Sequence, residues 1–331
     1  MAAIVDWRWL YATPNGIVAL QELDSNVVTL KQTPRPTDLP IAIRCIVLVT
    51  ELSLVSGGAF MLLLTSSLIG VLVRSLSHML LAATANDPVL EDTFVQICET
   101  VAFGYGLVAF ISFFFRRSKQ DLAQRLTGFG WCGVKTSNAS VAIHSAAILV
   151  LVLLQQQAKV QVLVSWSNVE AAMHQSDGPL ATAEIVQNLL LAPVKEELFF
   201  RGAVVLVTIN RTQSVKWSAA VSAVLFAAIH LANARHVGAQ YSVSYMAFQV
   251  LWAFLVGLFL ALKFAVSGSV VVCLVLHVIN NTFALAMSKT TEVSLTQPLV
   301  AFSVIAAVVI YCLAITKQLQ WLRPVQLKKQ L

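Results

Sequence analysis

Long apolar stretches recur along this chain and limit what it can fold into. Eight of them lie between residues 45 and 316, and most approach or exceed the roughly 20 apolar residues that a helix needs to cross a bilayer. A backbone inside a membrane must satisfy its own hydrogen bonds, so these stretches are expected to be helical. The sequence therefore predicts an all-α, multi-pass transmembrane helical bundle. The expected spans are 45–73, 94–115, 139–155, 181–209, 216–233, 243–264, 268–287 and 298–316.

The composition excludes an ordinary soluble domain. Hydrophobic residues make up 58% of the chain and charged residues only 11%, whereas a soluble domain has about 25% charged residues. The net charge of +6 does not indicate nucleic-acid binding, because the basic residues lie in short clusters between apolar stretches. The five cysteines are odd in number and scattered, so they predict neither a disulfide framework nor a metal-binding CxxC pattern.

The chain is expected to hold one membrane domain with short flanks. Residues 1–39 are interpreted as a cytoplasmic or interfacial segment without a signal peptide, because no apolar core with a small-residue cleavage site follows a basic start. Residues 40–317 form the transmembrane domain, and residues 318–331 form a basic cytoplasmic tail. No linker long enough for a soluble domain separates the spans, so they are expected to form one domain.

The distribution of Lys and Arg predicts the orientation in the membrane. With eight spans both termini lie on one side, and that side carries about four times as many basic residues as the other. The positive-inside rule then makes the termini cytoplasmic. The residues assigned to the cytoplasmic side are Arg8, Lys31, Arg35, Arg44, Arg116, Arg117, Lys119, Arg125, Lys135, Arg211, Lys216, Lys263, Lys317, Arg323, Lys328 and Lys329.

Two further features depend on this topology. The N-x-S/T sequons at Asn138 and Asn210 would face the cytoplasm and stay unglycosylated. The tail ends in Lys328 and Lys329, which resembles a dilysine signal for retrieval to the endoplasmic reticulum. The expected location is the endoplasmic reticulum membrane in a eukaryote and the plasma membrane in a prokaryote.

Ionisable and hydrogen-bonding side chains inside three of the spans are the main functional signal. An ionisable group in a membrane helix costs about 3 kcal/mol or more, so it usually has a function or a partner. The groups in the fourth, fifth and seventh spans are Glu196, Glu197, Arg201, His230, His277, Asn280 and Asn281.

Helical spacing separates the two glutamates. Glu197 and Arg201 are four residues apart, so they share a helix face and can pair. Glu196 lies about 100° around the helix and is free to face elsewhere. Pro193 removes a helical hydrogen bond and is expected to bend or start the helix, which suits a hydrated cavity.

The histidine spans show the same four-residue spacing. Phe226 shares a face with His230, and His277 shares a face with Asn281. His144 in the third span has small and apolar neighbours and is assigned to packing. A single membrane histidine is more often a helix-to-helix donor than a catalyst, so the functional argument depends on the three spans occurring together.

These motifs, in this order on apolar helices, resemble the CAAX protease and bacteriocin-processing (CPBP/Abi) family, which includes the type II CAAX prenyl endopeptidases. The resemblance covers residues 181–287, and the eight-helix layout agrees with it. The matching segments are Glu196-Glu197-Leu198-Phe199-Phe200-Arg201, Phe226-Ala227-Ala228-Ile229-His230 and His277-Val278-Ile279-Asn280-Asn281.

The resemblance implies a metal-independent glutamate peptidase that needs no cofactor. Its site would lie in an intramembrane cavity open to the cytoplasm. The substrate would be the C-terminal tail of a prenylated protein or peptide, with its lipid between helices of the bundle. The lipid bilayer is the other expected partner, and no nucleic acid is expected.

The chemistry of amide hydrolysis suggests roles for four residues. The reaction needs an activated water, a stabiliser for the oxyanion and a proton for the leaving amine. Glu196 is expected to act as general base, with His230 holding the same water. His277 and Asn281 are expected to donate hydrogen bonds to the oxyanion.

The neighbouring residues are expected to support this group. Glu197 and Arg201 would brace the helix that carries Glu196, and Phe226 would wall His230. Asn233 and Asn280 are accessory candidates.

Three alternatives stay open on the sequence. A zinc protease is conceivable because Glu and His are zinc ligands, although no HExxH motif occurs. A non-catalytic or bacteriocin-immunity protein could keep the same fold without turnover. A transporter could use a buried carboxylate to bind an ion, although no internal repeat is visible.

Overall fold

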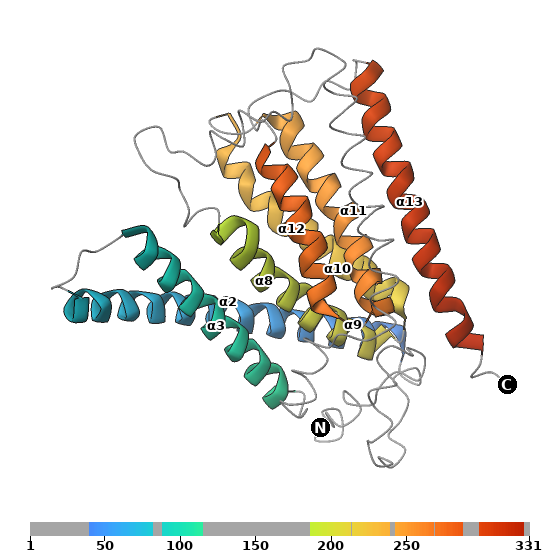
Figure 1. Cartoon of the computed structure of the whole chain (residues 1–331). Coiled ribbons are helices and arrows are strands. Elements are labelled where there is room, and N and C mark those ends of the chain that lie inside the picture. The colour runs from blue at the N-terminus through green and yellow to red at the C-terminus, as the bar shows by residue number, and fades with distance from the viewer. Residues whose placement is uncertain are drawn as a thin grey trace.

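The described part of the chain is helical throughout. The computed structural model describes residues 40–81, 88–114, 186–212, 214–238, 242–267, 269–286 and 298–327, and all its elements are helices (Figure 1). This confirms the all-α prediction. The predicted third span, 139–155, the N-terminal segment 1–39 and residues 328–331 lie outside the described residues.

Five of the described helices are long and apolar enough to cross a membrane, judged by length and composition. They are Ile41–Ser77, Leu90–Phe113, Val215–Arg235, Val243–Ser267 and Pro298–Gln320. Together with the apolar composition, they make the chain a multi-pass membrane protein.

Two of the predicted spans differ from a regular transmembrane helix. The seventh is α12, Val270–Ala286, which has only 17 residues. The fourth is helical from residue 186 to 212 but is interrupted by two π-helical segments. Seven of the eight predicted spans therefore correspond to described helices, of which five are long and two are shorter or interrupted. The remaining span, 139–155, lies outside the described residues.

The first two helices pack against each other at glycines. α2 spans Ile41–Leu81 and its 41 residues extend for about 60 Å, roughly twice the apolar thickness of a bilayer. α3 spans Pro88–Phe114 and packs along it. A Cβ atom at Gly58 would lie 2.5 Å from the ring of Phe110, so the glycine admits that ring. In Figure 1, α2 runs across the direction followed by α11, α12 and α13.

The centre of the bundle is α11, Val243–Ser267, packed against α10, Val215–His230. α11 is the most buried of the five long helices, with 61% of its apolar window inside the protein. A Cβ atom at Gly257 would lie 3.3 Å from the Cα of Ala223, so the two backbones approach closely at this point. α13, Pro298–Leu327, covers another side of α11.

Two basic residues that were counted for the cytoplasmic side are buried in helices. Lys263, near the end of the predicted span 243–264, lies inside α11 with a fully buried side chain. Arg211 lies in α9 (Val205–Thr212), and its side chain is buried as well. The predicted sixth span ended at residue 264, whereas the helix continues to Ser267. Neither Lys263 nor Arg211 therefore counts as a loop charge.

Candidate active site

The segment that carries the two glutamates is a helix of changing width. A short α-helix lies between two π-helical segments, and each π turn is closed by a bond to the fifth residue back: Ala192 N–H donates to the Gln187 carbonyl and Val205 N–H to that of Phe200. Such π segments are rare in proteins, and where they occur they are often at functional sites. The elements are η4 (Gln187–Leu191), α8 (Ala192–Glu197), η5 (Leu198–Val204) and α9 (Val205–Thr212).

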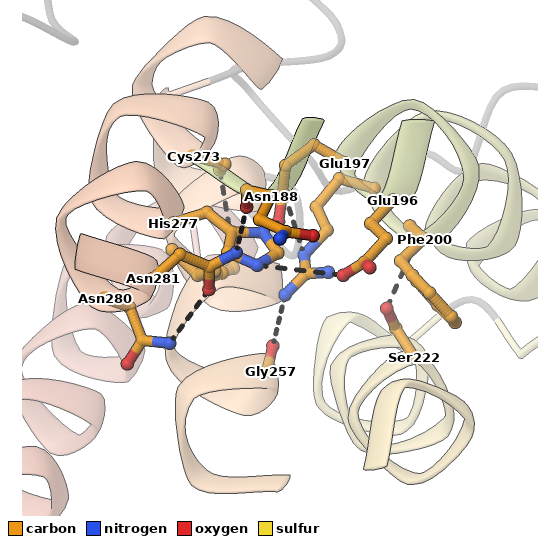
Figure 2. Close-up of polar contacts among 12 residues, drawn as sticks. Asn188, Glu196, Glu197, Phe200, Ser222, Gly257, Cys273, His277, Asn280 and Asn281 are labelled. Atoms are coloured by element: carbon orange, nitrogen blue, oxygen red, sulfur yellow. Dashed lines mark hydrogen bonds and ion pairs between the residues drawn. The ribbon is translucent and has the colours of Figure 1, made fainter. Parts of the chain in front are cut away.

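Pro193 explains why one backbone carbonyl is available to the site. Because Ala192 N–H is bonded to Gln187, the π-helical partner of the Asn188 carbonyl would be the backbone nitrogen of residue 193. Proline has no N–H, so it cannot supply that bond. The Asn188 carbonyl instead accepts a hydrogen bond from Nδ2 of Asn281, 3.0 Å away on α12 (Figure 2). The predicted disturbance at Pro193 thus links the fourth and seventh spans.

Glu197 is the buried centre of the polar network. Its side chain is fully buried, and its two oxygens face different partners. Oε1 lies 2.7 Å from Nδ1 of His277, and Oε2 lies 3.1 Å from Nε of Arg201. The second contact is the pairing that the four-residue spacing predicts. The contact with His277 was not predicted, and it joins the pair of Glu197 and Arg201 to a second helix, α12 (Val270–Ala286).

Arg201 spans the space between α8 and the α10–α11 pair. Its side chain is fully buried, and Nη2 donates to the Gly257 carbonyl at 3.4 Å. Its guanidinium carbon lies 4.7 Å from the centre of the Phe226 ring, a cation–π geometry. Nη1 has no hydrogen-bond partner within the part of the chain that the structure describes. The charge of Arg201 is therefore balanced chiefly by Glu197.

Glu196 differs from its neighbour in exposure and in contacts. Its side chain is 30% exposed, while that of Glu197 is 0% exposed. Oε2 of Glu196 lies 3.7 Å from Nε2 of His277, which is too long for a direct hydrogen bond. Figure 2 shows His277 between the two carboxylates. Although the glutamates leave the helix in different directions, both therefore meet the same imidazole.

His230 has a defined tautomer. Its Nδ1 lies 2.8 Å from the Phe226 carbonyl, which can only accept a hydrogen bond, so Nδ1 carries the proton. In the neutral ring, Nε2 then has a free lone pair. The ring of Phe226 lies 5.1 Å from that of His230 and 5.6 Å from that of His277, measured between centroids. Phe226 thus contacts both histidines.

Asn281 is held by polar neighbours on both sides. Its Oδ1 accepts from Nδ2 of Asn280 at 3.4 Å, and its Nδ2 donates to the Asn188 carbonyl (Figure 2). Asn280 in turn accepts a bond from Nε1 of Trp252, 2.9 Å away. Asn233, the other accessory candidate, donates to Oε1 of Gln249 at 3.2 Å instead.

The structure therefore brings six of the seven predicted site residues into one connected network. Glu197 contacts Arg201 and His277, which faces Glu196, and Phe226 lies against Arg201 and His277. His230 joins through Phe226, and Asn281 lies one helical turn from His277 on α12. Among the described residues, no group of three or more His, Cys, Asp or Glu side chains is arranged to hold a metal ion.

Three residues of this site were not predicted from the sequence. Asn188 contributes a backbone carbonyl, which the sequence signals only through the proline five residues later. Gly257 contributes a carbonyl and a close helix contact, and a glycine inside an apolar span is a weak sign of such an approach. Trp252 contributes an indole N–H, and its sequence neighbourhood gives no sign of that partner.

A known protein family matches the part of the chain that carries this site. Residues 178–283 match the family model described as type II CAAX prenyl endopeptidase Rce1-like. No curated protein and no solved structure gave a match. The matched region contains all three motifs and ends two residues after Asn281, which confirms the predicted family. The chain therefore contains an Rce1-like domain of the CAAX protease family, whose members are intramembrane proteases.

Proposed function

We propose that this chain is a glutamate endopeptidase that cleaves the C-terminal tail of prenylated CAAX proteins or related membrane-associated peptides. The observation that carries the proposal is the unequal environment of two adjacent carboxylates within the Rce1-like region. Glu197 is fully buried between Arg201 and His277, whereas Glu196 is partly exposed beside His277. A carboxylate that is left open in this way can act on water.

Glu196 removes a proton from the attacking water in this mechanism, and His230 holds the same water. Nε2 of His230 can accept a hydrogen bond from it, because Nδ1 carries the proton that is bonded to the Phe226 carbonyl. The water oxygen bonds to the scissile carbonyl carbon, and the carbonyl oxygen becomes an oxyanion. The proton held by Glu196 then passes to the leaving amine nitrogen as the C–N bond breaks.

His277 and Asn281 stabilise the oxyanion. Asn281 uses one amide N–H for the Asn188 carbonyl and has a second N–H to donate. His277 donates from Nε2 in its doubly protonated form, since Nδ1–H is bonded to Glu197. The carboxylates of Glu196 and Glu197 and the guanidinium of Arg201 together carry one net negative charge. A protonated His277 balances that charge.

The surroundings of the site are consistent with a lipid-modified substrate. Large apolar side chains are exposed along α2, α3 and α13, where a bilayer would cover them. The prenyl chain would lie among these helices. We propose cytoplasmic termini from the excess of basic residues, in the endoplasmic reticulum of a eukaryote or the plasma membrane of a prokaryote.

The decisive experiment compares the wild type with Glu196→Gln on prenylated and unprenylated CAAX peptides. We expect the wild type to release the C-terminal tail from the prenylated peptide. The variant should lose activity by about 100-fold to 10,000-fold, the range for removing a general base, while its unfolding temperature stays unchanged. Normal turnover by Glu196→Gln would contradict the mechanism, and a wild type without cleavage would favour a binding or immunity protein.

A chelator arm separates the proposal from a zinc protease. Cleavage should persist in EDTA, because none of the proposed steps uses a metal. Loss of cleavage in EDTA that zinc restores would assign Glu196, His230 or His277 to metal binding instead.

A further inference from the structure

The proposed oxyanion donor Asn281 is attached to a chain of hydrogen bonds that begins on another helix. Trp252 lies on α11, and its Nε1 is 2.9 Å from Oδ1 of Asn280 on α12. Nδ2 of Asn280 is 3.4 Å from Oδ1 of Asn281. The chain ends where Nδ2 of Asn281 donates to the Asn188 carbonyl at 3.0 Å.

Each bond in this chain has a fixed direction. The indole nitrogen can only donate, so it requires the oxygen end of the Asn280 amide. The nitrogen end of Asn280 is then directed at Asn281 and requires the oxygen end of that amide. The nitrogen end of Asn281 is left to face the Asn188 carbonyl, which can only accept. The two ends of the chain therefore impose the same orientation on both amides.

Trp252 is itself held in place by aromatic packing. Its ring is stacked on Phe248 at a centroid distance of 5.7 Å and an interplanar angle of 19°. Tyr311 of α13 meets it edge-on at 5.2 Å and 88°. Tyr311 has a fully buried side chain. The start of the hydrogen-bond chain is therefore set by packed helices, away from the reacting groups.

From this geometry we infer that Trp252 is a positioning residue for the proposed peptidase reaction. Acting through Asn280, it orients the Asn281 amide so that an N–H, and not the carbonyl oxygen, is presented to the oxyanion. Donors of this kind are effective because their orientation is fixed before the reaction. An Asn281 amide turned by 180° would present an oxygen and repel the developing negative charge. This inference rests on the proposed function and on the role of Asn281 within it.

The test is a double-mutant cycle with Trp252→Phe, Asn281→Ala and the combined variant, assayed on a prenylated CAAX peptide. Phenylalanine keeps an aromatic ring against Phe248 and Tyr311 but removes the N–H. We expect Trp252→Phe to lower kcat about tenfold with KM unchanged, less than the roughly 100-fold expected for losing a direct oxyanion donor. In the Asn281→Ala background the same substitution should have no further effect.

Trp217→Phe is the matched control, because its side chain is 67% exposed on α10 and makes no part of this chain of bonds. It should leave kcat and KM unchanged. A second measurement follows the indole ¹H–¹⁵N resonance of Trp252, assigned by its loss in Trp252→Phe. Asn280→Ala should shift that resonance, since the indole loses its acceptor.

Two results would overturn the inference while leaving the proposed function intact. One is an active wild type in which the effects of Trp252→Phe and Asn281→Ala multiply, which would indicate separate packing effects. The other is an indole resonance that does not respond to Asn280→Ala. A wild type without cleavage would instead reject the proposed function, and with it a positioning role in that reaction.

Discussion

Adjacent glutamates with different surroundings carry most of the chemistry at the scale of single residues. Glu197 is engaged by Arg201 and His277, and Glu196 faces the same histidine at a distance too long for a direct bond. Buried charges are stable only when they are paired, so Glu197 is suited to a structural role. Glu196 keeps a partly exposed carboxylate and is suited to proton transfer.

This difference predicts different outcomes for the same substitution at the two positions. Glu197→Gln keeps the shape of the side chain but leaves the buried Arg201 charge unbalanced. Removing one partner of a buried ion pair costs about 3–5 kcal/mol, so we expect a clear fall in unfolding temperature together with loss of activity. Thermal unfolding in detergent measures the first effect, and peptide cleavage measures the second.

Glu196→Gln serves as the matched control for that experiment. It lies one residue away and is expected to lose activity at an unchanged unfolding temperature. Equal unfolding temperatures for the two variants would mean that the Glu197 network does not stabilise the fold.

Helix packing at the scale of elements depends on a few small residues. Gly257 lets α10 and α11 approach, and it also offers its carbonyl to Arg201. Phe226 lies across this contact, with its Cδ1 3.0 Å from where a Cβ atom at residue 257 would stand. Since the same ring contacts His230 and His277, the distance between α10 and α11 affects the positions of both histidines.

Gly257→Ala is therefore expected to disturb both stability and catalysis. The added methyl group meets the Ala223 backbone and the Phe226 ring, and overpacking of this kind costs about 1–3 kcal/mol. We expect a lower unfolding temperature and a reduced kcat. The measurements are thermal unfolding and steady-state cleavage of the prenylated peptide.

Gly57→Ala provides the control inside another helix. A Cβ atom at Gly57 would meet nothing within 4 Å, so this variant should be neutral or slightly stabilising. A Gly257→Ala variant that behaved like Gly57→Ala would show that α10 and α11 have room to separate.

One buried ion pair connects distant parts of the chain at the scale of the whole molecule. Arg211 on α9 pairs with Glu51 on α2 through two side-chain contacts, and their side chains are 3% and 1% exposed. α9 continues directly from the segment that carries Arg201. The pair therefore fixes the long first helix to the end of the site-bearing segment.

Glu51→Gln should accordingly destabilise the whole protein. The expected cost is about 3–5 kcal/mol, because a buried guanidinium loses its carboxylate. Asp92→Asn is the matched control, since the pair of Arg74 and Asp92 is 50% and 47% exposed and such surface pairs contribute about 0–1 kcal/mol. Thermal unfolding of the two variants compares the pairs, and equal shifts would contradict a special role for Glu51.

The sequence by itself determined the all-α membrane architecture, the family and the face-sharing pair of Glu197 and Arg201. These features depend on apolar length, on motifs and on helical spacing, all of which are local properties of the chain. The sequence also indicated a disturbance at Pro193, because a missing N–H is a property of that residue alone. It did not predict π turns on both sides of α8 or the extension of α11 to Ser267.

The tertiary structure decided which of the polar groups meet. Spacing within one helix cannot show that His277 joins both glutamates, that Asn281 reaches the Asn188 carbonyl or that Trp252 reaches Asn280. Each of these contacts links residues on different helices, so it depends on how the helices rotate and cross when they pack. The same holds for Glu51 and Arg211, which are 160 residues apart in the chain. Packing therefore turned two glutamates that are neighbours in sequence into one buried brace and one open carboxylate.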